Sequence, residues 1–193
     1  MINDKEDIKS WLDSMQIKNY TINDDFTVDV DGSVDLYNKK LTALPVQFGN
    51  IIGNFKCYNN QLTTLQGVPQ SISGYFDCSN NKLPNLVGGP KSVNGDFYCY
   101  NNQLTTLEGC SQIVGGNFSC FKNHIIDLND FHCEFSGTFY HTASVIEDLS
   151  EFYIDGQLSL TYKEIENIKL NNKLNDTIKD KAKTINSINK KKL

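Results

Sequence analysis

The chain of 193 residues contains no arginine, so all 18 of its basic residues are lysines. Arginine makes the bidentate contacts by which many proteins read guanine or hold phosphate, whereas lysine offers only a point charge. The net charge is −5, but residues 160–193 hold nine lysines against four acidic residues, which leaves −10 on the rest. An acidic body without arginine argues against nucleic acid as the main partner.

The sequence also lacks a long apolar run. None approaches the ~20 residues that a transmembrane helix needs. The N-terminal segment MINDKEDIKSWLDSM is acidic and broken by charges, unlike the apolar core of a secretory signal. We therefore expect no membrane segment and a cytoplasmic location, where the six cysteines would be reduced thiols.

The chain does contain a repeat with a period of 21 residues. Its glycines are Gly32, Gly53, Gly74, Gly95, Gly116 and Gly137. Phenylalanine follows most of these glycines after two residues, cysteine after four, asparagine after seven, and leucine or isoleucine after nine and twelve. The phenylalanines and cysteines are Phe55, Phe76, Phe97, Phe118 and Phe139, and Cys57, Cys78, Cys99 and Cys120. Columns that hold one register over so many repeats indicate a solenoid with one coil per repeat.

Within each repeat, the F-x-C segment alternates as a short strand does, with phenylalanine and cysteine pointing inward. Strands stacked at ~4.8 Å would place like residues above one another and join the inner columns into one core. The asparagine column (Asn60, Asn81, Asn102, Asn123) fits a buried ladder of side-chain amides bonded to the backbone. Gly67, Gly88 and Gly109 mark the turn on the far side of the coil.

The pattern F-x-C-x-x-N-x-L-x-x-L resembles the leucine-rich-repeat signature L-x-L-x-x-N-x-L, in its short bacterial form of about 20–22 residues. Asn60, Leu62 and Leu65 match it in one repeat. Phenylalanine and cysteine in place of the usual strand leucines, as in GDFYCYNNQLTTLEG, are similar to repeat proteins encoded by tailed bacteriophages and some bacteria. The resemblance covers residues 32–152 and implies a leucine-rich-repeat solenoid, with a parallel β-sheet on its concave face and short turns on its convex side.

The segments at either end of the repeats predict caps, which a solenoid needs over its terminal apolar faces. Residues 1–31 form the predicted N-terminal cap, with Ile8, Trp11, Leu12 and Met15 at helical spacing over residues 4–15 and strands from Phe26 to Leu36. Residues 32–157 are six repeats of 21. Residues 158–193 would add a degenerate last strand, with Leu158, Leu160 and Tyr162 on the repeat register, and a C-terminal cap helix from Lys163 onward.

The outward positions of the predicted sheet lie one, three and five residues after each glycine. They supply the predicted protein-binding residues Asp35, Tyr37, Lys56, Tyr58, Tyr75, Asp77, Asp96, Tyr98, Tyr100, Phe121 and Tyr140. Aromatic residues on an exposed face suggest that a partner covers them, and tyrosine is enriched at interfaces. The aspartates among them favour a partner with basic groups. The alternative is that aromatic residues simply suit strands.

The six cysteines invite a metal or disulfide interpretation, but no C-x-x-C is present. The four in the inward column are expected to be buried small hydrophobes. Cys110 and Cys133 lie off the column and are the better candidates for modification. The segment DVDGSVD from Asp29 loosely resembles a calcium loop, but Val34 and Lys40 stand where glycine and glutamate are needed, so a D-G hairpin turn is favoured.

Three hypotheses on function follow. The first is a protein-binding module that recognises and sequesters or inhibits a partner through its concave sheet. The phage-like resemblance implies that this partner is a host protein, such as one of host defence, met in the host cytoplasm. The second is a structural or assembly protein, monomer or homodimer, that uses its C-terminal helix for oligomerisation or docking. The third is an enzyme using Cys133 with His132 or His141. No catalytic motif accompanies that pair, so we expect no enzyme, no metal and no cofactor.

Overall fold

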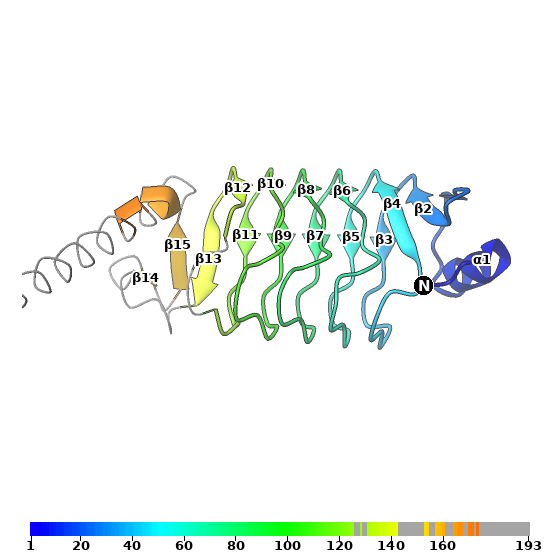
Figure 1. Cartoon of the computed structure of the whole chain (residues 1–193), viewed down its shortest axis with the longest axis horizontal. Helices are drawn as coiled ribbons and strands as arrows, with labels where there is room; N and C mark the ends of the chain where they lie inside the picture. The colour runs from blue at the N-terminus through cyan, green and yellow to red at the C-terminus, as the bar shows by residue number, and fades with distance from the viewer. Residues whose placement is uncertain are drawn as a thin grey trace, which may run out of the picture.

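A computed structural model describes residues 1–125, 128, 131–142, 153–154, 157–160, 164–167, 170–171 and 173. In this structure the chain is a β-solenoid whose coils repeat every 21 residues and follow one another in a straight row (Figure 1). Strands of successive coils pair in parallel, so that Phe55 lies opposite Phe76 and Phe76 opposite Phe97. The predicted parallel stacking is confirmed.

Two sheets run along the solenoid. The first has the order β1 (Tyr20–Ile22), β2 (Thr27–Val30), β4 (Gln47–Ile51), β6 (Ser71–Ile72), β8 (Ser92–Val93), β10 (Ile113–Val114) and β12 (Glu134–Phe135). The second has the order β14 (Tyr153–Ile154), β15 (Gln157–Leu160), β13 (Phe139–Thr142), β11 (Phe118–Ser119), β9 (Phe97–Tyr98), β7 (Phe76–Asp77), β5 (Phe55–Lys56) and β3 (Val34–Asp35). The second sheet is the one that the F-x-C pattern predicts. From β4 onward, the first sheet occupies a part of the repeat where only turns were expected.

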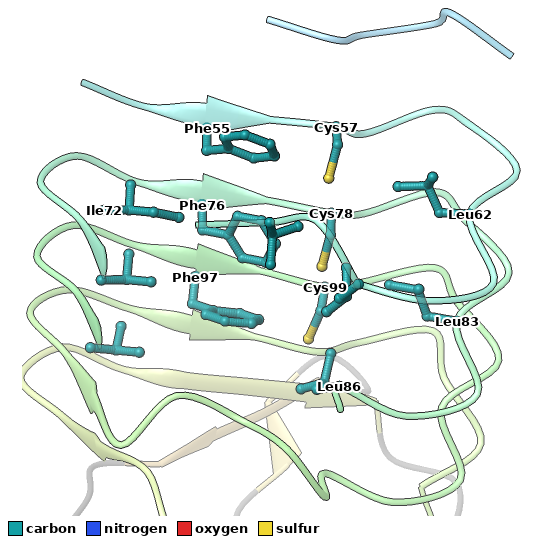
Figure 2. Close-up of a cluster of buried hydrophobic side chains, with 14 of the residues drawn as sticks. Phe55, Cys57, Leu62, Ile72, Phe76, Cys78, Leu83, Leu86, Phe97 and Cys99 are labelled. Atoms are coloured by element: carbon teal, nitrogen blue, oxygen red, sulfur yellow. The ribbon is translucent and has the colours of Figure 1, made fainter. Parts of the chain in front are cut away.

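The core consists of columns of identical or similar side chains. Figure 2 shows Phe55, Phe76 and Phe97 above one another, with Cys57, Cys78 and Cys99 in the neighbouring column. All six are fully buried, which confirms their inward direction. The first sheet adds a further buried column, not recognised in the sequence: Ile51, Ile72, Val93, Val114 and Phe135.

The repeated glycine occupies the corner between the two sheets, where successive backbones come very close. The N–H of Gly95 donates to the carbonyl oxygen of Gly74 at 2.9 Å, and Gly74 bonds Gly53 in the same way. A Cβ at Gly95 would lie 3.0 Å from the carbonyl carbon and oxygen of Gly74, closer than side chains normally approach backbone. Close packing of the corner therefore accounts for the glycine column.

The asparagine ladder forms as predicted at the other end of each F-x-C strand. The Nδ2 of Asn81 donates to the carbonyl oxygens of Cys57 (3.0 Å) and Cys78 (3.1 Å), in two successive coils. Its Oδ1 accepts from the backbone N–H of Leu62 at 2.9 Å. Because these are backbone groups of buried coils, the amide satisfies both a donor and acceptors that water cannot reach.

At the N-terminal end, helix α1 (Lys5–Ser14) occupies the segment predicted as a helix. Asp4 accepts hydrogen bonds from the N–H groups of Glu6 and Asp7, and so begins the helix. Ile8 and Leu12 are fully buried, and the predicted strands beyond the helix are β2 and β3. The prediction of a hairpin turn at Asp31–Gly32 is wrong: these residues form the first corner between β2 and β3, whereas the antiparallel hairpin joins β1 to β2.

At the other end, β15 pairs with β13 in the antiparallel direction, with Leu160 opposite Phe139. Leu160 thus extends the phenylalanine column, but the strand is not another parallel repeat. Residues 164–167 are helical and Ile165 is buried. Tyr162 and most of the predicted C-terminal helix lie outside the described residues. The division at residues 31 and 157 stays a prediction.

Candidate binding face

The residues that point outward from the second sheet form one surface, here called the binding face. Its central row follows the strand pairing, from Asp35 through Lys56, Asp77, Tyr98 and Ser119 to Tyr140. The rows on either side carry the other predicted residues. Tyr37 is 44 % exposed, and the remaining aromatic residues of the face are partly buried. The structure therefore places all the predicted residues in the strands of one sheet or within two positions of them.

The aromatic residues of the face are packed against one another. Tyr37 stacks on Tyr58 with ring centroids 4.4 Å apart, and Tyr100 stacks on Phe121 at 4.5 Å with the ring planes 4° apart. Tyr98 makes T-shaped contacts with Tyr100 and with Tyr75, with ring centroids 6.4 and 6.1 Å apart. Such contacts hold each ring in place before any partner arrives.

All three aspartates of the face are held by contacts within the chain, beginning with Asp35 and Asp96. Asp35 accepts from the N–H of Tyr37 at 3.0 Å through Oδ1, and its Oδ2 lies 3.3 Å from the Lys56 Nζ. Asp96 accepts from the N–H of Asn117 (2.7 Å) and from the Tyr98 hydroxyl (2.6 Å). The bond to Asp96, together with burial, raises the pKa of Tyr98 well above its ordinary value. The carboxylates of Asp35 and Asp96 thus hold backbone N–H groups, and that of Asp96 also holds the Tyr98 ring. The sequence pattern did not reveal this role.

Asp77 differs from the other two aspartates. It is partly buried, and its Oδ1 accepts from the backbone N–H of Ser79 at 3.0 Å and from the Ser79 hydroxyl. Burial raises the pKa of Asp77, although the bonds from Ser79 and the charge of Lys56 act in the opposite direction. Asp77 is therefore held in place by Ser79, at a partly buried position where its charge is disfavoured.

Lys56 is the cation within the three outward rows, as far as the structure describes them. Its Nζ lies 3.3 Å from Asp35 Oδ2 and 5.9 Å from the centroid of the Tyr75 ring. Burial lowers its pKa, but hydrogen bonds to Tyr75 and Asp35 outweigh this, and the pKa is raised. Lys56 is thus a fixed part of the face.

A second side-chain ladder, missed in the sequence, runs along the row next to the glycine corner. The side chains of Ser33, Asn54, Asp96 and Asn117 each accept from the backbone N–H of the residue 21 positions further on, at 2.7–3.0 Å. The signal was visible as a column of short oxygen-bearing residues. Tyr75 interrupts this column, so its ring is free to contribute to the aromatic surface instead.

The cysteines of the inward column, Cys133 and His141 lie in the core. Burial raises the pKa of the column thiols, as expected for core residues. Cys133 is only 1 % exposed and its pKa is also raised by burial, so the prediction that it is accessible for modification is wrong. His141 is buried as well and stacks on Phe139. A protonated, buried thiol is a poor nucleophile.

Comparison with known proteins returned no match to a family model, to a curated protein or to a solved structure. Among the residues described, no group of three or more histidine, cysteine or acidic side chains is arranged to hold a metal ion. Within the same part of the chain, no helix combines the length and apolar character required to cross a bilayer. Function must therefore be argued from the binding face itself.

Proposed function

We propose that the chain is a protein-recognition module that binds a protein partner on the binding face, and thereby sequesters or inhibits it. The observation that carries this proposal is the set of partly exposed aromatic rings, stacked in pairs on a regular sheet. Tyrosine offers a rigid apolar ring with a polar tip, and rings that are already held lose little conformational freedom on binding. Such residues are typical of interface hot spots.

The dimensions of the face support a protein partner. Six parallel strands at ~4.8 Å give a length of about 24 Å, and the five residues of each coil that run from the first outward row to the third give a width of about 17 Å. This area of about 400 Å² is about half of the ~800 Å² that each partner contributes to a standard interface, so a partner of standard size would also contact the loops that flank the face. Its charged members, three aspartates and one lysine, favour a partner with a basic surface.

The finer classification is part of the same proposal. The asparagine ladder and the parallel F-x-C strands support a leucine-rich-repeat type of coil, although the extra first sheet departs from the expected arrangement. A host protein as partner, and the host cytoplasm as the place of action, are supported by the resemblance of the repeats to phage-encoded proteins. Self-association through the C-terminal helix is the alternative role.

The proposal is tested by affinity capture from a bacterial lysate, with the wild-type chain and a Tyr58→Ala, Tyr98→Ala, Tyr100→Ala variant. A matched control carries Ile52→Ala, Val87→Ala and Ile113→Ala, which are exposed side chains outside the binding face. We expect the control to retain a specific partner and the tyrosine variant to lose it, since hot-spot truncations cost about 2 kcal/mol or more each. Circular dichroism checks that both variants fold. Equal retention by both would refute the assignment of this face.

A further inference from the structure

Two of the corner glycines follow an aspartate or an asparagine. Asp31 precedes Gly32 in the first corner, and Asn94 precedes Gly95 in the fourth. Both Asp31 and Asn94 are exposed. In such pairs the backbone nitrogen of the glycine can attack the side-chain carbonyl carbon before it, because glycine has no Cβ to hinder closure of the five-membered ring. Two chemically similar pairs therefore occupy the same position of the fold.

The nitrogen of Gly95 is held inside the glycine stack. Its N–H donates to the carbonyl oxygen of Gly74 at 2.9 Å, and its own carbonyl oxygen accepts from the N–H of Gly116 at 3.1 Å. The backbone of Gly74 lies only 3.0 Å from the place that a Cβ of Gly95 would occupy. To attack Asn94, this nitrogen would have to leave both its hydrogen bond and its close-packed position.

Gly32 lies at the open end of the same stack. Its carbonyl oxygen accepts from the N–H of Gly53 at 2.9 Å, but its own N–H has no acceptor among the residues that the structure describes. The place of a Cβ on Gly32 has nothing within 4 Å. The N–H of Asp31 donates to the carbonyl oxygen of Asn19 at 2.9 Å, so the chain just before the glycine is fixed. The Gly32 nitrogen thus lacks the bond that every later corner glycine makes.

We propose that Asp31 is a site of spontaneous isomerisation to isoaspartate in the folded protein, and that the glycine stack protects Asn94 from the corresponding deamidation. In the first step the Gly32 nitrogen bonds to the Cγ of the protonated Asp31 carboxyl and gives up its proton, while the carboxyl hydroxyl leaves as water. Water then opens the succinimide. Cleavage of the bond between nitrogen and Cγ restores aspartate, whereas cleavage at the main-chain carbonyl leaves the chain running through Cγ, which is isoaspartate. Water is the only reactant added.

The product has one more main-chain atom at the corner between β2 and β3. This corner is fixed on both sides, because β2 pairs with β4 and β3 pairs with β5. A longer chain therefore disturbs the first coil, where Asp35 and Tyr37 begin the binding face. The modification itself does not depend on the proposed function, since it needs no partner.

The test compares each site with its own rate in the unfolded chain. The wild-type protein is incubated at neutral pH, folded or unfolded in guanidinium chloride, then digested and analysed by mass spectrometry with electron-transfer fragmentation, which distinguishes isoaspartate from aspartate. We expect folding to leave the rate at Asp31 nearly unchanged and to slow deamidation of Asn94 at least about tenfold, because the hydrogen bond alone accounts for a factor of that order. Equal slowing at both sites, or none at Asn94, would overturn the proposal. The third such pair, Asp155–Gly156, lies outside the described residues and is followed in a separate peptide.

Two variants at the exposed position 31 sharpen the comparison. Asp31→Asn gives both corners the same chemistry, so the amide at position 31 should deamidate at least about tenfold faster than Asn94 in the same folded sample. Asp31→Ser is the matched control, because it keeps a polar side chain but removes the carbonyl carbon, and its peptide should gain no isoaspartate. Circular dichroism checks the fold, and if Asp31→Asn does not fold, the wild-type rates decide. Equal rates at the two amides of the folded variant would refute the protective role of the glycine stack.

Discussion

Replacing Asn102 by alanine should destabilise the solenoid far more than any change at the neighbouring Asn101. The Nδ2 of Asn102 donates to the carbonyl oxygens of Cys78 (3.0 Å) and Cys99 (3.1 Å), and its Oδ1 accepts from the N–H of Leu83 at 3.1 Å. The side chain belongs to a residue only 7 % exposed. Its removal therefore leaves three backbone groups without this partner in a place that water does not reach.

The magnitude follows from the cost of an orphaned buried group, about 1–3 kcal/mol. The Leu83 N–H bears that cost in full, whereas the carbonyl oxygens of Cys78 and Cys99 keep the bonds from Asn81 and Asn123 and so lose less. We expect a total loss of about 2–4 kcal/mol, a large share of the 5–15 kcal/mol typical of a domain. In a stacked array the loss also weakens the contact between neighbouring coils.

Asn101→Gly is the matched control. Asn101 is exposed, has a φ of +54° that glycine adopts readily, and its side chain makes one bond, to Asn80 Oδ1. Its loss should cost less than about 1 kcal/mol. Urea unfolding followed by far-ultraviolet circular dichroism gives both free energies of unfolding. A difference between the two variants below about 1 kcal/mol would refute the reasoning on the ladder.

Four further predictions address other parts of the molecule. A thiol reagent at neutral pH should modify Cys110, which is partly exposed, well before the other five cysteines, and Cys133 should react only on unfolding; early reaction of Cys133 would contradict its burial. Because burial raises the pKa of Asp77, its contribution to stability is fully present below the ordinary aspartate range and is lost as pH rises through the raised value. The wild type should therefore lose melting temperature over that rise relative to Asp77→Asn, and parallel curves would exclude the effect. Gly95→Ala should cost about 1–3 kcal/mol in urea unfolding, because its Cβ would press on the backbone of the preceding corner; a neutral result would show that the corner can relax. Deletion of residues 163–193 should leave a chain that still binds its partner if that segment is only a cap, whereas a change of mass in light scattering would favour the assembly role.

The sequence predicted the second sheet and the asparagine ladder because both follow from long columns in one register. Phe76 and Cys78 repeat with their neighbours through five and four coils, which is enough to fix which side chains point inward. The first sheet was missed although Ile72 and Val93 keep the same register. Each of its short strands contributes one inward apolar residue, whereas each F-x-C segment has two at alternate positions, so the alternation that identifies a strand was absent from the first sheet.

The candidate site was predicted less completely. Register alone was sufficient to place Tyr58, Tyr98 and Tyr100 on one surface. It could not show that Asp96 is held by Asn117 and Tyr98, because a hydrogen bond depends on side-chain rotamers and not on position in a column. The burial of Cys133 was not predicted either, because its position in the repeat is exposed in the earlier coils. Gln70, Lys91 and Gln112 occupy that position and are exposed, whereas Cys133 is buried.

The corner where one glycine bonds the next has a consequence for how such a chain can change in length. Each bond of that stack joins residues 21 positions apart, as do the strand pairs on either side of it. An insertion of any other size within a coil would put a side chain where only hydrogen fits and turn the phenylalanines away from the interior. Duplication or loss of one entire winding preserves every contact, so the natural unit by which this protein grows or shortens is the whole winding.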